Sequence, residues 1–533
     1  MAEALETPSE GPLLTKSHFL ARVGTRGRGR HASPRPMNRR SPTRSPGQAE
    51  PGATRLAPWL APCLLLVLAG CGGGGDDEVR AADSARPNRA PSAAEAARRL
   101  ASIGYAEALP VAADELDLEG VVLHDEELAC PGWNLYATRQ VGRDAKGERY
   151  AAGARLVDNE GRLRHRWATQ VRGETLAWIE EHLPSFVPEY MTGWNHVELL
   201  PDGDLLAVGN HHLLARFDRD AELVWKLDIP AHHDVRLGPD GNLYTLIDGL
   251  RTVELDGEPV VVQDNWILML TQEGEELRRW SLWDAYQRTD ELAQRLLPSL
   301  RKIPAHYERA LARLEELTPQ DDAEGQLRLE LYRDAVSGDY TEHTEVKNVL
   351  VHGYTADIFH SNSIQVLERD EPGLWEAGDL LVSIRIQDTV AVLDRDTGAI
   401  LWEWGPGELE LQHHATWLED GTILVFDNGA RRGWSRILRV DPRSREVVWE
   451  YHAEEPEDFF TEARGGVQPL PNGNFLVAES NPGRVFEVTP EKEIAWEFYG
   501  PIRAEREGEA LREAIYRMTR LPKEALGAFR GPR

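Results

Sequence analysis

The sequence predicts an all-β protein folded as a six-bladed β-propeller, and three observations support this fold class. A unit of two strands around a Pro-Asp-Gly or Pro-Asn-Gly turn, a strand ending in Asp and a strand ending in Trp recurs along the chain. Trp402, Trp449 and Trp496 follow one another at intervals of 47 residues. A four-stranded unit of about 40 to 50 residues is the size of a propeller blade, and 533 residues suffice for six blades.

Six copies of this unit occupy most of residues 118–500. The copies align at the tryptophan that ends each of them. They occupy residues 154–167, 197–225, 235–280, 364–402, 415–449 and 467–496. Because each tryptophan closes its unit, we interpret these six side chains as packing residues between neighbouring blades rather than as ligands.

Two segments depart from the strand pattern. Between the third and fourth copies, residues 282–345 place apolar side chains every three to four residues among charges, which predicts a helical insertion of two or three amphipathic helices. This insertion is either a lid over the propeller mouth or a packing appendage on its rim. Residues 501–533 are expected to form a helical tail, with a charged helix over 503–520.

The N-terminal segment has the pattern of a secretory signal. Arginines precede an apolar run over residues 59–69 that ends in Leu68-Ala-Gly-Cys71, too short to span a membrane. The end of this run resembles a bacterial lipobox, so residues 1–70 are expected to be removed and Cys71 acylated. Residues 71–117 read as a tether with a short helix over 93–108. This predicts a periplasmic, lipid-anchored lipoprotein, on the outer membrane of a Gram-negative bacterium because Gly72 follows the cysteine.

Charge and composition exclude several kinds of partner. The formal net charge of −29 repels phosphate backbones, which argues against nucleic acid. Three cysteines, one of them within the predicted signal, do not provide a disulfide framework. The glycines at 72–75 belong to the tether rather than to a strand-to-helix turn, so no phosphate-binding loop is indicated. We therefore expect no cofactor and no metal.

The repeat allows equivalent positions at the propeller mouth to be read from the sequence. Innermost strands begin beside the central channel, so polar residues at these positions converge. The residue eight positions before the turn glycine is Asn195 in the second blade, His233 in the third and His413 in the fifth. In the fourth blade alignment gives Asn362 there. His360 lies two residues earlier, on the same strand face if the alternation is regular.

Arg385 lies in an apolar strand run of the fourth blade, between Ile384 and Ile386. A buried guanidinium requires an anionic partner. Three histidines and this arginine around a channel would form a site for a tetrahedral oxyanion, with the arginine on two oxygens and an imidazole able to attack the central atom.

Other histidines are expected to be structural. The doublet His211-His212 shows that adjacent histidines alone carry little meaning, and His196 lies one position off the register. In a regular strand, His232 and His414 point away from the channel side of their neighbours.

Several motifs resemble those of bacterial aryl-sulfate sulfotransferases. They are His-His-Asp-Val at 232–235, Phe-His-Ser-Asn-Ser-Ile at 359–364, Ser-Ile-Arg followed by Gln at 383–387, Gln-His-His-Ala at 412–415 and Phe-Asp-Asn-Gly at 426–429. The opening at 129–136 also looks like the family's first blade. The resemblance extends over most of residues 118–500. Departures are Ile386 where some members carry histidine, the long insertion, and the lack of cysteines for a disulfide found in some members.

The resemblance implies that His413 is the nucleophile and that His360, Arg385 and His233 bind the sulfuryl group, with His232 an alternative to His233. Asn362, His232 and Asn428 are expected to bind the substrate.

The implied reaction is ping-pong transfer of a sulfuryl group from a phenolic sulfate ester to a phenolic acceptor, independent of nucleotide sulfate. The alternatives are a metal-dependent propeller hydrolase or lactonase, and a non-catalytic propeller binding protein. Arg385 among the histidines would repel a cation and disfavours the metal enzyme.

Overall fold

The computed structural model describes residues 108–111, 115–138, 152–187, 191–352, 356–506 and 509–523. The predicted signal, the predicted lipidation site Cys71, the predicted tether and residues 93–107 of the predicted short helix lie outside these residues. In the described part, no helix is both long and apolar enough to cross a membrane.

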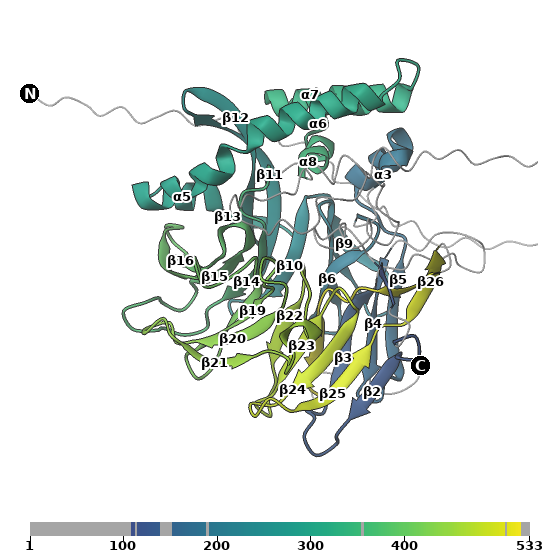
Figure 1. Cartoon of the computed structure of the whole chain (residues 1–533), viewed down its shortest axis with the longest axis vertical. Helices are drawn as coiled ribbons and strands as arrows, with labels where there is room; N and C mark the ends of the chain where they lie inside the picture. Colours follow the sequence, from purple (N-terminus) through teal and green to yellow (C-terminus); the bar gives the residue numbers. More distant parts are fainter. Residues whose placement is uncertain are drawn as a thin grey trace, which may run out of the picture. The chain divides into compact units, whose positions relative to one another are not determined.

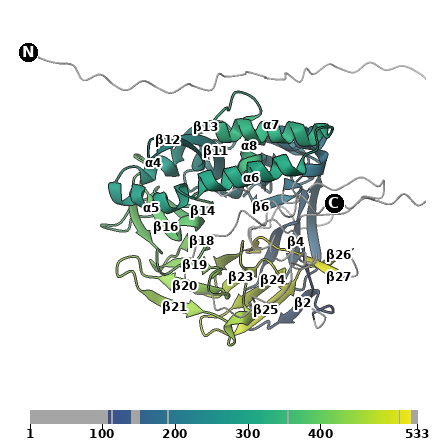
Figure 2. The ribbon, with the colours of Figure 1, turned by 45° about the horizontal axis from the view of Figure 1, so that its top comes forward.

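Six antiparallel sheets of four or five strands follow one another around a ring, which confirms the six-bladed propeller (Figures 1 and 2). Each of the second to fifth blades contains four consecutive strands of the chain, numbered from the channel outward. The second blade contains β6 (Trp194–Leu199), β7 (Leu205–Gly209), β8 (Leu213–Phe217) and β9 (Leu223–Leu227), and the third contains β10 (Ala231–Leu237), β11 (Leu243–Leu255), β12 (Glu258–Leu270) and β13 (Glu276–Ser281). The fourth blade contains β14 (Ser361–Val366), β15 (Leu380–Ile384), β16 (Thr389–Leu393) and β17 (Ile400–Trp404). The fifth contains β18 (His413–Trp417), β19 (Ile423–Asp427), β20 (Arg436–Val440) and β21 (Val447–Tyr451).

Strands from both ends of the described chain close the ring. The first blade consists of β3 (Trp133–Thr138), β4 (Ala152–Asp158) and β5 (Leu163–Thr169), and β28 (Met518–Leu521) pairs with β3 as its innermost strand. The sixth consists of β22 (Gly466–Pro469), β23 (Phe475–Glu479), β24 (Arg484–Val488) and β25 (Ile494–Tyr499), and β2 (Gly120–His124) adds a fifth, outermost strand. This pairing joins the last blade to the first, and only short edges remain at the outermost strands of the blades.

The predicted helical tail is wrong. Its described residues form strands β26 (Ile502–Arg506), β27 (Glu509–Glu513) and β28. β26 and β27 form a small sheet with β1 (Ala108–Pro110). The charged pattern over 503–520 has no strong intrinsic preference, and the free edges offered by β3 and β1 decide its conformation.

The six predicted packing tryptophans join each blade to the next. Each indole N–H donates to a backbone carbonyl in a turn of the following blade, and the sixth blade donates to the first. The bonds are Trp167 to Asp218, Trp225 to Gln272, Trp280 to Arg395, Trp402 to Pro442, Trp449 to Pro490 and Trp496 to Asn159, at 2.8 to 3.1 Å. The repeat seen in the sequence is therefore a ring of hydrogen bonds between blades.

The insertion between the third and fourth blades is helical, as predicted, but residues 282–352 hold five helices rather than two or three. They are α4 (Leu282–Tyr286), α5 (Asp290–Leu300), α6 (Ile303–Leu317), α7 (Ala323–Ser337) and α8 (Thr344–His352). The helices lie against the long β11–β12 hairpin (Figure 1), where the Tyr307 hydroxyl donates to the Val261 carbonyl at 3.0 Å. They share one apolar core with the third and fourth blades.

Candidate functional site

A small buried cavity of about 30 Å³ lies where the innermost strands begin. It is lined by Asn195, Asn210, His211, His233, His352, His360, Arg385, His413, Ala463, Arg464 and Tyr516. The structure thus brings together the predicted His413, His233, His360 and Arg385 from the third, fourth and fifth blades. His352 is the last residue of α8, so the insertion contributes to the wall of the cavity, as a lid would.

Irregular backbone at the mouth determines which side chains face the cavity. In β10, β14 and β18 the pairing with the next strand shifts register between residues 232 and 235, 361 and 363, and 413 and 415. His233 and His360 have φ values of 60° and 50°, a conformation that is costly for residues with a Cβ. A bulge breaks the alternation of a regular strand. It places His233 rather than His232 at the cavity.

The tautomer of His413 is set by Asn428. The Asn428 Nδ2 donates to the Thr461 and Arg464 carbonyls, each at 2.7 Å, so its Oδ1 is the atom that faces His413 Nδ1 at 2.7 Å. Because Oδ1 only accepts, Nδ1 carries the hydrogen and Nε2 carries the lone pair. Nε2 accepts a long bond of 3.2 Å from the Arg464 backbone N–H.

The His413 side chain is held neutral. Burial, followed by the nearby Arg385 guanidinium, keeps the pKa of His413 well below its usual 6.5. A neutral imidazole with its lone pair on Nε2 is the nucleophilic form of the residue. Arg385 lies in a short turn, Arg385–Gln387, immediately after β15 rather than within the strand run.

His360 forms a pair with Asp357. The His360 Nδ1 lies 2.8 Å from Asp357 Oδ2, and the same carboxylate accepts the His360 backbone N–H at 2.7 Å. Burial lowers the pKa of His360, while Asp357 opposes that shift. The carboxylate therefore orients the ring and offsets part of the effect of burial on the protonated form, which is the form that can donate a proton.

A second carboxylate supports the histidines of the other wall. Asp248 Oδ1 lies 3.1 Å from His232 Nε2, and its Oδ2 contacts His211 Nδ1. His232 Nδ1 in turn lies 2.8 Å from His233 Nδ1. The His233 pKa is lowered well below 6.5 by burial and then by His360.

The three residues expected to bind substrate lie behind the cavity wall. His232 and Asn428 bond the rings of His233 and His413, and so support residues that face the cavity. Asn362 bridges two blades: its Nδ2 donates to the Gln412 carbonyl at 2.9 Å and its Oδ1 accepts from the His414 backbone. The assumption of regular alternation from His360 fails at the bulge in β14.

Sequence reasoning missed several cavity residues. His211, which was expected to be structural, and Asn210 directly follow β7, the second strand of their blade. Arg385 and Asn428 directly follow the second strands β15 and β19. The polar residues just after the second strand of each blade were the pattern in the sequence that could have identified these positions.

Arg464 and Tyr516 were missed for a different reason. Both precede innermost strands by two residues, β22 and β28. Tyr516 belongs to the segment that was expected to be helical, so its place at the mouth was hidden.

Among the described residues, two overlapping groups of side chains have the spacing of metal ligands. They are His211, Asp248 and His352, and His352, Asp357 and His360, with candidate ligand atoms within 4.8 Å of one another. Imidazole and carboxylate together suit zinc or similar ions. Arg385 and Arg464 in the same cavity oppose a cation there.

The buried neutral histidines make folding stability depend on pH. Burial and then Arg517 lower the pKa of His414 well below 6.5. Below pH 6.5 the unfolded chain binds a proton at this residue that the folded protein does not, so stability is lost as pH falls. Burial raises the pKa of Glu479 to about 7, so this residue contributes stability that increases as pH falls. The effect of His414 alone is therefore measured by comparing the wild type with a variant that lacks this histidine.

We expect His414→Gln to flatten this dependence between pH 6.5 and 5 by up to about 1.4 kcal/mol per pH unit. The measurement is urea unfolding of both proteins across that range. Parallel curves for the two proteins would show that His414 is protonated in the folded state.

Fold and site define a class of protein: a six-bladed β-propeller with histidines and arginines gathered around a buried cavity at the start of its innermost strands. Residues 336–500 match the model of the arylsulfotransferase (ASST) family. This match supports the resemblance to the arylsulfotransferase family that the motifs indicate. No curated protein matches the chain.

Solved structures that match are distant in sequence. A protein of unknown function from Bacteroides caccae is 11% identical, covers 73% of this chain and 98% of its own, and has a TM-score of 0.40. The selenomethionine-substituted virginiamycin B lyase from Staphylococcus aureus is 12% identical, with 57% and 69% covered and a TM-score of 0.30. The Dos1 propeller is 10% identical, with 75% and 80% covered and a TM-score of 0.35.

Proposed function

We propose that the protein is an aryl-sulfate sulfotransferase, which moves a sulfuryl group from a phenolic sulfate ester to a phenolic acceptor through a covalent sulfohistidine at His413. The observation that carries the proposal is the Asn428 contact, which leaves the lone pair of a neutral His413 on Nε2 in a cavity shared with Arg385. The family match over residues 336–500 supports the reaction class.

The first half-reaction forms a bond between His413 Nε2 and sulfur while the bond from sulfur to the phenolic oxygen breaks. The departing phenolate takes a proton from the protonated form of His360, which Asp357 orients and helps to stabilise. In the second half-reaction the acceptor phenol returns a proton to His360, and its oxygen attacks sulfur as the bond to Nε2 breaks. Arg385 binds oxygens of the transferring group, whose spread charge requires mainly positioning and electrostatic stabilisation.

Neutralising Asp357 should slow transfer according to the leaving group. We expect Asp357→Asn to slow transfer from an alkyl-substituted phenyl sulfate by roughly 10- to 100-fold, because a basic phenolate needs the proton. The effect on 4-nitrophenyl sulfate should be much smaller, since nitrophenolate leaves without protonation. Asp256→Asn, at an exposed carboxylate, is the control. Equal losses with both donors would show that Asp357 only maintains the structure.

The test of the proposed activity is a transfer assay with purified protein and 4-nitrophenyl sulfate, with and without added phenol. We expect release of nitrophenol that depends on phenol, together with formation of phenyl sulfate. Nitrophenol without phenyl sulfate would indicate hydrolysis, and no turnover with a range of donors and acceptors would contradict the proposal.

A metal-dependent hydrolase is the second candidate, because the two His/Asp groups have metal-ligand spacing. Metal analysis and chelation separate the candidates. A stoichiometric ion whose removal abolishes activity would favour the hydrolase, whereas transfer that is unchanged after chelation would favour the sulfotransferase.

We propose further that the mature protein is anchored in the outer membrane, facing the periplasm, through a lipid on Cys71. The support is the arginine-flanked apolar run that ends in Leu68-Ala-Gly-Cys71. We expect radioactive palmitate to label the wild-type protein in cells, with loss of the label in Cys71→Ser. Equal labelling of both proteins would contradict the anchor.

A further inference from the structure

A second pocket, of about 210 Å³, lies further along the innermost strands. The innermost strands line both spaces: residues at or just before their beginnings line the cavity around His413, and residues further along line this pocket. The strand residues of the pocket are Arg236 and Leu237 of β10, residues 364–366 of β14, 414–416 of β18, 466–469 of β22 and 518–519 of β28. The two pockets share no lining residue. The second pocket therefore lies in the channel, on the side away from the mouth.

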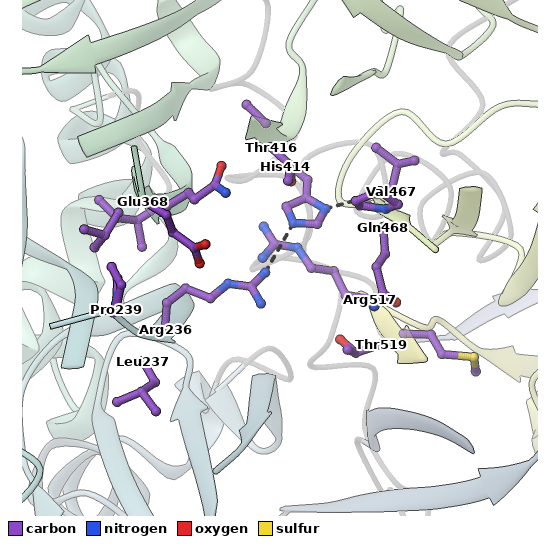
Figure 3. Close-up of a pocket in the computed structure, with 18 residues that line it drawn as sticks. Arg236, Leu237, Pro239, Glu368, His414, Thr416, Val467, Gln468, Arg517 and Thr519 are labelled. Atoms are coloured by element: carbon purple, nitrogen blue, oxygen red, sulfur yellow. Dashed lines mark hydrogen bonds between the residues drawn. The ribbon is translucent and has the colours of Figure 1, made fainter. Parts of the chain in front are cut away.

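Arg236, His414 and Arg517 converge in this pocket (Figure 3). His414 Nδ1 accepts the backbone N–H of Val467 at 3.0 Å. A neutral imidazole that accepts at Nδ1 carries its hydrogen on Nε2, and burial keeps the pKa of His414 low enough for the neutral form. His414 Nε2 is therefore a donor.

That donor faces another donor. Arg236 Nη2 lies 3.2 Å from His414 Nε2, and a guanidinium has no acceptor. The two groups cannot bond each other, so their hydrogens are directed together toward the space between them. An acceptor placed there would satisfy both groups, and an anionic one would bind more strongly.

Arg517 adds buried positive charge beside this pair. It is 5% exposed, its Nη2 bonds the Asn362 carbonyl, and its Nη1 pairs with Asp234 Oδ1 at 3.1 Å. Within the part of the chain that the structure describes, its Nε has no hydrogen-bond partner. Burying a guanidinium donor without a partner is costly.

Two carboxylates outside the pocket form ion pairs with its arginines. The fully buried Asp234 pairs with Arg236 Nε at 3.2 Å as well as with Arg517, and Glu198 pairs with Arg236 Nη1 at 3.1 Å. Neither acid lines the pocket, whereas both guanidiniums and His414 do. Glu368 lies on the wall and is exposed. The carboxylates fix the donors without occupying the position between Arg236 Nη2 and His414 Nε2.

We propose that the channel pocket is a second anion site, which binds a small oxyanion, the chemistry shared by sulfate, phosphate and carboxylate, between Arg236 and His414 and beside Arg517. The site is separate from the cavity around His413 and does not rest on the proposed transfer reaction.

The experiment measures binding of inorganic sulfate to the full chain by isothermal titration calorimetry. The parent protein carries Arg385→Gln, which weakens sulfate binding in the cavity around His413. Arg236→Gln should weaken sulfate binding by roughly tenfold or more, because a charge-assisted pair of donors is lost. Arg443→Gln, which removes the same charge from an exposed arginine paired with Glu371, is the matched control and should bind as its parent does.

A second measurement covers the case in which Arg236→Gln does not fold. The side-chain ¹⁵N resonances of His414, assigned by their loss in His414→Gln, should shift on addition of sulfate to the Arg385→Gln protein. Titrations with phosphate and acetate distinguish tetrahedral oxyanions from carboxylates, with chloride as the ionic-strength control. Sulfate binding that is unchanged by Arg236→Gln, unshifted His414 resonances, or a response to chloride equal to that of every oxyanion would overturn the proposal.

Discussion

Replacing His413 by asparagine should lower the rate of sulfuryl transfer by about 10⁴-fold or more, because the residue that forms the covalent intermediate is lost. Asparagine fills part of the same space but has no lone-pair nitrogen to attack sulfur. The measurement is kcat/KM with 4-nitrophenyl sulfate and phenol.

His452→Asn is the matched control, because His452 is exposed and its Nδ1 donates to the backbone carbonyl of Ala453 at 2.7 Å. We expect this variant to retain wild-type activity. Activity within tenfold of wild type in His413→Asn would exclude His413 as the nucleophile.

Replacing Arg385 by lysine should lower kcat by roughly 10²- to 10³-fold, comparable to the removal of a preorganised oxyanion donor. Charge is retained, but a compact ammonium cannot reproduce the two-pronged contact of a guanidinium with two sulfuryl oxygens. Arg385 also helps to keep the pKa of His413 low. The pH at which the rate falls on the acid side of the pH–rate profile should therefore shift less in Arg385→Lys than in Arg385→Gln, because lysine keeps the charge.

Arg443→Lys, at an exposed salt bridge, serves as the control for an arginine-to-lysine change. Near-normal kcat in Arg385→Lys would mean that the guanidinium fork does not contact the transferring group.

The blades and their order were predictable because each repeat carries the same physical signal. The tryptophans that end the units form the ring of indole-to-carbonyl bonds from Trp167 to Trp496. The turn glycines gave the strand register closely enough to place His233 and His413 at the mouth. Repetition makes such positions readable, since one register applies to several blades.

The details of the mouth were not predictable, because they depend on backbone irregularity and on distant pairing. The bulges in β10 and β14 turn His233 inward and leave Asn362 between blades, and the pattern of residue types does not reveal a bulge. Tyr516 reaches the cavity only because β28 pairs with β3, far away in the sequence. Local propensity does not encode that pairing.

The covalent state of His413 tests the central proposal most directly. Purified protein is incubated with 4-nitrophenyl sulfate in the absence of an acceptor, quenched at neutral or alkaline pH, digested and analysed by mass spectrometry. We predict a sulfuryl group on the peptide that contains His413, which disappears when phenol is added before the quench. An active enzyme whose His413 peptide stays unmodified, or an adduct on another residue, would contradict the account.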